Sequence, residues 1–342
     1  MPPWPSNKRW RPVSRAGRLF GIAGGAVLVV MFLACVLSLP WTLGRIAPAS
    51  GSAPYTTTPR RYEATDLSRI LLPPSWAPHA ADERTRLAEA RARSGRPVRL
   101  VFGSDRLGRD LFARCLAGGG ISLAIGLAAA CIAVVIGTTW GTVAGYFGGR
   151  TDAVLMRIVD ILFGLPAILL VVLLAVASEG LIDRSGRDLS PAVRQAVNVV
   201  TLLVAIGGVS WLTMARVIRG QVMSLRNQPF IEASRAIGVR LPRQFAVHLL
   251  PNLTGPIVVY ATLAVPAAIL SESFLSFLGI GVREPLPSWG NLAAAGLSEL
   301  NTVRVRWWLL FWPCLFIGLT LLALNFVGES LRQMSDPRRR VA

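Results

Sequence analysis

PFIEASRAIGVRLPRQFAVHLLPN, residues 229–252, is a polar stretch between long apolar segments. It carries three arginines but only one acid, Glu232. Glu232-Ala233-Ser234 can open a short helix, and Gly238 can end it. Leu241-Pro242 can begin a second helical piece, since proline fits the first helical turn, where its missing N–H is not needed. The stretch therefore predicts a short amphipathic helix between two membrane spans, which is a suitable shape for docking a partner.

The rest of the chain is apolar enough to belong to a membrane protein. Of its 342 residues 53% are hydrophobic and the mean hydropathy is +0.52, above what a soluble domain shows. A transmembrane helix needs about 20 mostly apolar residues. The predicted fold is an all-α membrane protein with six transmembrane helices. These six spans are expected at residues 19–39, 121–146, 153–177, 196–218, 253–278 and 307–327.

The net charge of +18 does not indicate a nucleic-acid partner, because the arginines cluster at the ends of the apolar spans. The positive-inside rule predicts this placement. With both termini in the cytoplasm, the short internal segments and tails carry many more basic residues than the two short external loops. This asymmetry predicts that residues 229–252 lie in the cytoplasm.

The expected organisation has five parts. The first apolar run is longer than the 7–15 residues of a secretory signal, so we expect an uncleaved first span. Cleavage after Ala47-Pro48-Ala49 is the alternative. The loop before the second span is polar and long, with a short surface helix expected over residues 82–93. The parts are a cytoplasmic tail (1–18), the first transmembrane helix (19–39), a long external loop (40–112), a five-helix transmembrane domain (113–332) and a cytoplasmic C-terminal tail (333–342).

The sequence predicts no catalytic, cofactor or metal site. Lys8 is the single lysine and Arg9 follows it, so the Gly-Lys-Ser/Thr of a phosphate-binding P-loop does not occur. His79 and His248 are far apart, and no pair of cysteines has CxxC spacing. The chain is therefore not expected to be an enzyme. If it takes part in ATP-driven work, another chain hydrolyses the ATP.

The opening stretch resembles the EAA loop of ABC importer permeases. Glu232-Ala233-Ser234, Gly238 and Leu250-Pro251 stand at the family spacing, which covers about twenty residues. Ser234 replaces an alanine, and His248 occupies a position that is usually apolar. Neither change affects the glutamate, the glycine or the Leu-Pro pair.

Four further stretches narrow the resemblance to C-type permeases of the dipeptide, oligopeptide and nickel class. Gly103-Ser104-Asp105 and Gly108-Arg109-Asp110 match the family pattern before the second span, with serine in place of threonine. The others are Met156-Arg157 with Asp160 and Pro166, then Pro287-Ser288-Trp289-Gly290-Asn291, and finally Asp336-Pro337-Arg338. The resemblance covers nearly all of residues 100–337.

The resemblance implies the type I ABC importer permease fold, with a cytoplasmic coupling helix in a prokaryotic inner membrane. The chain would form half of the translocation pathway of an ATP-driven importer for peptides or similar small solutes. Its implied partners are a homologous permease in a heterodimer, two ABC ATPase subunits, an extracytoplasmic solute-binding protein and membrane lipid. The implied ATPase-coupling residues are Glu232, Ala233, Ser234, Gly238, Leu250 and Pro251.

Three residues are candidates for the translocation path. Glu272 lies near the outer end of the fifth span, and ionisable residues inside a membrane are functional candidates. An interhelical hydrogen bond is the alternative role for this carboxylate. Trp289 and Asn291 either line the path or shape the outer loop. In the third span, Asp160 can pair with Arg157 on one helix face.

A secondary transporter or channel that works without ATP is the alternative function. It would need ion-coupling carboxylates or an inverted repeat, but the spans hold few charges and no repeat is evident. From the sequence alone, the candidate solutes are peptides, nickel chelates and sugars.

Overall fold

The computed structural model describes residues 15–46, 58–94, 99–184, 190–300 and 305–335. Its regular structure over these residues is helical, apart from three isolated β-bridges. Five of the described helices are long and apolar enough to cross a membrane, and the number is six if a bent pair of helices is counted as one span. The five are α1 (Arg15–Thr42), α3 (Leu111–Phe147), α6 (Pro191–Leu225), α9 (Leu250–Phe277) and α11 (Trp307–Ser335). The predicted all-α membrane fold is confirmed.

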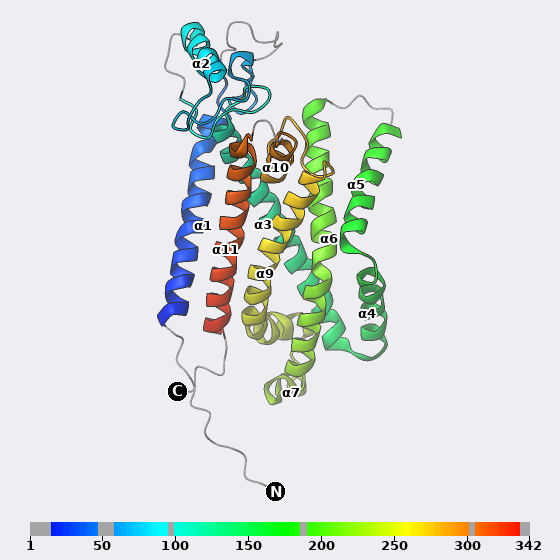
Figure 1. Cartoon of the computed structure of the whole chain (residues 1–342). Helices are drawn as coiled ribbons and strands as arrows, with labels where there is room; N and C mark the ends of the chain where they lie inside the picture. Colours follow the sequence, from blue (N-terminus) through cyan, green and yellow to red (C-terminus); the bar gives the residue numbers. More distant parts are fainter. Residues whose placement is uncertain (1–14, 47–57, 95–98, 185–189, 301–304, 336–342) are drawn as a thin grey trace.

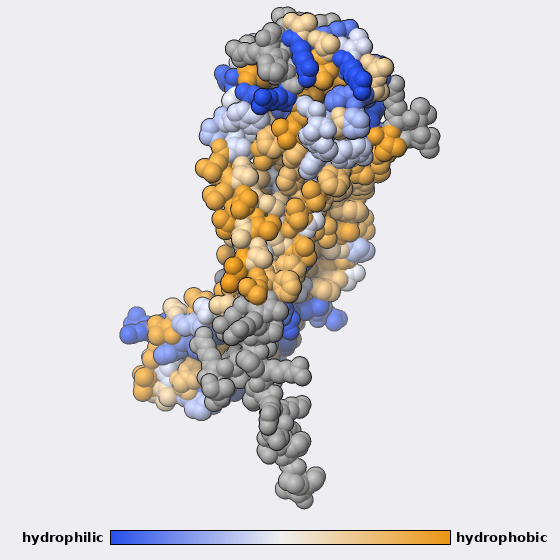
Figure 2. Space-filling model, turned by 60° about the vertical axis from the view of Figure 1, so that its left-hand side comes forward, coloured by the Kyte–Doolittle hydropathy of each residue, from blue (hydrophilic) through white to orange (hydrophobic). Residues whose placement is uncertain are grey.

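The long helices stand roughly parallel in one bundle (Figure 1). α1 and α11 lie side by side at one edge, and α3, α9 and α6 form the middle of the bundle. The short helices α2 (Ala81–Ser94) and α10 (Trp289–Leu297) lie at one end, and α7 (Pro229–Ala236) lies at the other. Figure 2 shows an apolar belt between two polar ends, as a bilayer-spanning protein requires.

The first residue of α1 and the last residue of α11 lie at the same end of the bundle as α7 (Figure 1). We call this the α7 end, and the opposite one the α2 end. The terminal tails predicted at 1–18 and 333–342 fall mostly outside the described residues, as does the alternative cleavage site at 47–49.

The third span is not the single helix expected over 153–177. It consists of α4 (Gly149–Phe163) and α5 (Ala167–Arg184), whose axes differ by 85°. Pro166 lies in the break, and the residue before a proline avoids the helical conformation because of a steric clash with the ring. Figure 1 shows α4 below α5 at one edge of the bundle, with α5 running along the bundle.

Close packing of α3 against α6 forms the middle of the bundle. Gly137, Gly141 and Gly145 recur every fourth residue on the α3 face that meets α6. A Cβ atom at Gly141 would lie 2.4 Å from the carbonyl oxygen of Ala215. Small residues at such positions let two transmembrane helices approach closely.

Residues 58–94 and 99–110 form a small cap at the α2 end. The cap contains the 3-10 helix η1 (Leu67–Arg69) and α2, which includes the short helix predicted over 82–93. Leu72, Leu87, Ala90 and Leu100 form a buried apolar cluster of its own. The segment expected to be a polar loop is therefore a folded unit.

Candidate functional site

The helix predicted around Glu232 is α7, and it begins at Pro229, three residues before that glutamate. It ends at a glycine, as the sequence predicts. Gly238 has φ of +73°, its N–H donates to the Arg235 carbonyl at 3.0 Å, and the Val239 N–H donates to the Ser234 carbonyl at 3.1 Å. This is the Schellman arrangement, which satisfies the last helical carbonyls and turns the chain sharply.

One face of α7 is fixed to the bundle, while the other is exposed. Ile231 is fully buried in a cluster with Val222 of α6 and Leu249. Glu232 and Ala233 lie on the exposed surface, and the side chain of Ile237 is 80% exposed. The exposure of Ile237 was missed, because the sequence alone does not show whether an apolar residue before a helix-ending glycine is buried or exposed.

The chain after α7 is tied to the end of α3. α8 (Leu241–Gln244) begins at the predicted Leu241-Pro242, and a π-helical turn, η2 (Phe245–Leu249), leads into α9. The buried Gln244 amide donates to the Val239 carbonyl at 3.1 Å, and its carbonyl oxygen accepts from the Tyr146 hydroxyl at 2.6 Å. These two hydrogen bonds join the segment that follows α7 to the end of α3.

Leu250 and Pro251 form the first turn of α9, not a part of α7. Both lie on the exposed surface. Of the six predicted coupling residues, the structure thus groups Glu232, Ala233, Ser234 and Gly238 on one short element, and places the Leu-Pro pair where the membrane span begins.

Two ion pairs join α4 to α6 at the α7 end. Arg219 binds Asp152 through both carboxylate oxygens, one of them at 2.6 Å. Arg216 binds Asp160 at 2.8 Å, and its guanidinium lies 4.0 Å from the centre of the Phe163 ring. Asp160 therefore pairs across to α6, whereas the sequence suggested Arg157 on the same helix.

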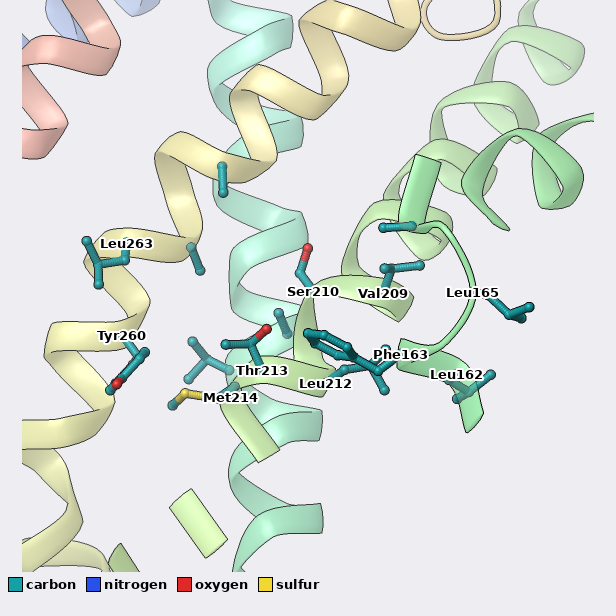
Figure 3. A pocket seen from close by; sticks show the side chains of 15 residues that line it. Leu162, Phe163, Leu165, Val209, Ser210, Leu212, Thr213, Met214, Tyr260 and Leu263 are labelled. Atoms are coloured by element: carbon teal, nitrogen blue, oxygen red, sulfur yellow. The ribbon is translucent and has the colours of Figure 1, made fainter. Parts of the chain in front are cut away.

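A cavity of about 530 Å³ opens inside the bundle between α3, α6, α9 and the α4–α5 bend (Figure 3). Its wall is apolar except for the hydroxyls of Ser210, Thr213 and Tyr260. Figure 3 shows these side chains on α6 and α9, with Phe163 reaching in from α4. A second cavity of about 350 Å³ shares Val209 and Ser210 with it.

The predicted path residues line neither of these two cavities. Glu272 is fully buried, and its carboxylate accepts a hydrogen bond from the Ser276 hydroxyl at 2.8 Å. The Ser276 oxygen in turn accepts from the Val282 N–H at 2.9 Å. The Ser122 and Ser288 side chains also face the Glu272 carboxyl group. Glu272 is thus part of a polar network between helices near the α2 end.

Trp289 and Asn291 belong to α10, which packs beside this network. The buried Trp289 indole N–H donates to the Cys115 carbonyl at 3.0 Å, which fixes α10 to α3. Asn291 forms a capping box with Ser288, and its amide donates to the Leu286 carbonyl at 2.9 Å. These contacts shape the loop at the α2 end, and a direct role in translocation stays a prediction for all three residues.

A buried ion network joins the cap to the bundle at the α2 end. The Asp105 carboxylate binds Arg109 at 2.6 Å and also binds Arg114, whose side chain is 1% exposed. Glu284, from the loop after α9, binds Arg109 at 2.8 Å and Arg114 at 3.0 Å. Burial raises the pKa of Glu284, but the two guanidiniums outweigh it and lower that pKa to about 2. The Glu284 carboxylate is therefore ionised at neutral pH.

Other residues of the stretch 103–110 stabilise the turn that precedes α3. The buried Ser104 hydroxyl accepts from the Leu72 N–H at 2.9 Å. Gly108 has φ of +70°, and a Cβ atom there would lie 1.9 Å from the Asp66 carbonyl oxygen. Asp110 caps α3, because its side chain accepts a hydrogen bond from the Phe112 N–H.

Residues 137–341 match the family model described as binding-protein-dependent transport system inner membrane component. The matched segment is more than half of the chain, and it includes α7, the α4–α5 bend and most of the cavity wall. The chain belongs to this family. It is a multi-pass permease component of an inner-membrane transport system. Among its described residues, no group of three or more histidine, cysteine, aspartate or glutamate side chains is placed to hold a metal ion.

Named relatives agree with this family. Oligopeptide permease OppC of Haemophilus influenzae is 42% identical over 239 residues, which cover 70% of each chain. Dipeptide permease DppC of Bacillus subtilis is 43% identical over 239 residues, 70% of this chain and 69% of the relative. Di/tripeptide permease DppC of Pseudomonas aeruginosa is 32% identical over 325 residues, 94% of this chain and 89% of the relative.

A solved structure of the MetNI methionine ABC transporter, in an inward-facing conformation, is 17% identical to the chain. It aligns with a TM-score of 0.48, over 66% of this chain and 97% of that one.

Proposed function

We propose that this permease forms one half of the translocation pathway of an ATP-driven importer of short peptides. The observation that carries the proposal is α7, a capped helix with one face buried in the bundle and the other exposed. It is tied to helices that line a membrane cavity. The named relatives at 42–43% identity are oligopeptide and dipeptide permeases, which supports peptides as the solute class.

The α7 end is proposed to face the cytoplasm. Exposed arginines gather there, as the positive-inside rule expects of cytoplasmic segments. They include Arg157, Arg216, Arg235, Arg240, Arg243 and Arg332. Two ATPase subunits would then dock at the α7 end, and an extracytoplasmic solute-binding protein at the α2 end. A homologous permease would complete the pathway as the other half of a heterodimer.

Coupling is proposed to be a rigid-body movement. An ATPase that shifts α7 would also shift α3 through the Gln244–Tyr146 hydrogen bond. Because α3 packs closely on α6, and the Arg219–Asp152 pair joins α6 to α4, the walls of the cavity would move together. In this mechanism the permease converts a displacement at its cytoplasmic surface into a change of access, and the partner ATPases supply the energy.

The cavity wall suits solutes of varied side chain. Ser210, Thr213 and Tyr260 offer neutral hydroxyls that can exchange hydrogen bonds with a peptide backbone, and the remaining lining is apolar. Translocation requires that the path binds its solute only weakly, so that it can leave again. Selection among peptides would then be made by the solute-binding protein.

Transport in proteoliposomes tests the proposed function. We expect the permease, purified with its partner subunits, to take up a labelled short peptide only when the solute-binding protein and ATP are present. Collapse of the proton gradient by an ionophore should leave the initial rate unchanged. The reading is overturned if the purified chain alone accumulates peptide in response to a proton gradient, since that result identifies a secondary transporter.

Filling the cavity should block uptake. Ala267 lines the cavity and is exposed, so Ala267→Trp would place a large ring in the path without disturbing a packed core. We expect at least a tenfold lower uptake rate, with the complex assembled and basal ATP hydrolysis retained. Val258→Trp is the matched control, because Val258 is exposed on the same helix but lines neither cavity. Equal uptake by the two variants would exclude this cavity from the path.

A further inference from the structure

An apolar groove of about 320 Å³ runs between the end of α3 and the α8–η2 segment. On α3 its wall is formed by Thr139, Val143 and Phe147, which recur every fourth residue. These residues span eight positions, so the wall extends about 12 Å along the helix axis. Leu241 and Phe245 form the facing wall. Val143 is 42% exposed and Phe147 is 58% exposed, so the groove is open to its surroundings.

Positive charge surrounds the α7 end of this groove. Arg240 and Arg243 flank the groove-lining Leu241-Pro242, and both are exposed. The Arg235 guanidinium lies 4.9 Å from the centre of the Tyr146 ring, which also lines the groove. None of these three arginines forms an ion pair with another residue of the described chain.

We propose that this groove binds an anionic phospholipid of the inner membrane, such as phosphatidylglycerol. An acyl chain would lie along the groove-lining face of α3, and the phosphate would bind the arginines at its end. Arginine recognises phosphate through charge-assisted, often bidentate hydrogen bonds. Basic pockets beside transmembrane helices at the headgroup level are suited to anionic lipids. These last turns of α3 end the membrane-spanning helix Leu111–Phe147, and a headgroup is expected near the end of such a span.

A lipid fits this groove better than a protein segment does, because the surface around the groove is also apolar. The exposed apolar side chains of Val247 and Leu250 continue the apolar surface from η2 to the start of α9. The bound lipid would contact both α3 and α8, on either side of the Gln244–Tyr146 hydrogen bond. This site is independent of the proposed transport function, since it requires only that the bundle spans an anionic bilayer.

Lipid capture by the purified complex tests the site. The permease, together with its partner subunits, is exposed in detergent to a photoactivatable phosphatidylglycerol or phosphatidylcholine, and cross-linked peptides are mapped by mass spectrometry. We expect labelling of α3 or α8 peptides that favours phosphatidylglycerol at least tenfold. The triple substitution Arg235→Gln, Arg240→Gln and Arg243→Gln should remove this preference. Arg332→Gln, an exposed arginine elsewhere at the α7 end, is the control and should retain it.

A second pair of variants tests the contribution of the apolar groove independently of the arginines. Val143→Trp would fill the groove and should abolish labelling by both lipids, whereas Val135→Trp, on the same helix and outside the groove, should not. The proposal is overturned if the triple variant keeps its preference or if Val143→Trp is labelled like the control. A photoreactive amino acid placed at position 143 that captured a partner subunit in place of lipid would also overturn it.

Discussion

Replacing Ile237 with aspartate is expected to weaken the binding of the ATPase subunits by ten- to a hundredfold and to abolish peptide uptake at cellular concentrations. The side chain is 80% exposed just after the last residue of α7, at the end of the bundle where the ATPase subunits are proposed to dock. Burial of an isoleucine in a protein contact contributes about 1.5–3 kcal/mol, and each 1.4 kcal/mol is about tenfold in affinity. Titration of the reconstituted permease with purified ATPase measures the change, and peptide uptake follows it.

The matched control is Leu67→Asp, which alters an equally apolar side chain, 59% exposed, in the cap at the α2 end. It should leave ATPase binding unchanged. Thermal unfolding should be the same for both variants and the unmodified permease, because neither side chain is part of the core. If Ile237→Asp binds ATPase with unchanged affinity, the coupling surface lies elsewhere.

Gly238→Ala tests whether ATPase binding to α7 can be separated from the movement that α7 passes to the rest of the permease. An L-residue at the observed φ of +73° is strained by about 1–2 kcal/mol, so the turn after α7 should shift while its exposed face stays chemically the same. We expect ATPase binding to persist and uptake per ATP hydrolysed to fall. Glu232→Gln, on the exposed face itself, should instead act on binding.

The structure of this loop was predictable because its rules are local. The glycine after α7 and the proline at the start of α8 act within a few residues, so these two boundaries follow directly from the sequence. The start of α7 did not, because the helix begins at Pro229 and not at the predicted Glu232. The exposure of Ile237 did not follow, because it depends on how Ile231 packs against Val222 and Leu249. Local rules therefore give the helix, and the tertiary packing decides which face it offers to a partner.

The bend in the third span could not be predicted from the pattern of its apolar residues. Its apolar residues predicted one straight helix, because a continuous apolar run does not reveal an 85° bend. The Asp160–Arg216 pair joins residues far apart in the sequence, so a same-helix partner was the natural expectation. Glu272 illustrates the same limit, because its serine partners come from several segments that only the folded bundle brings together.

Family resemblance identified the outer motif without explaining it. Asp105 and Arg109 matched a known pattern, but their partner Glu284 lies 175 residues beyond Arg109 and carries no visible signal. The structure gives the motif a physical role, since its charges are buried and satisfy one another. Removing one of these charges should therefore lower the stability of the protein strongly.

Asp105→Ala is expected to lower the free energy of unfolding by about 3–5 kcal/mol, because it removes one partner from a buried ion network. Arg114, whose side chain is 1% exposed, would lose its bond to Asp105 and keep only Glu284. Arg109 would lose its 2.6 Å bond in the same way. The cap and the start of α3 should therefore separate before the rest of the bundle unfolds.

Tryptophan fluorescence during denaturation in detergent measures this loss. Asp82→Ala is the control, because its pair with Arg86 is exposed and contributes only about 0–1 kcal/mol. Combining Asp105→Ala with Arg114→Leu should recover part of the stability, since replacing a buried ion pair with apolar side chains is often nearly neutral. A loss below about 1 kcal/mol for Asp105→Ala would show that water or Glu284 alone satisfies both arginines. The ion network would then be dispensable for holding the cap on the membrane domain.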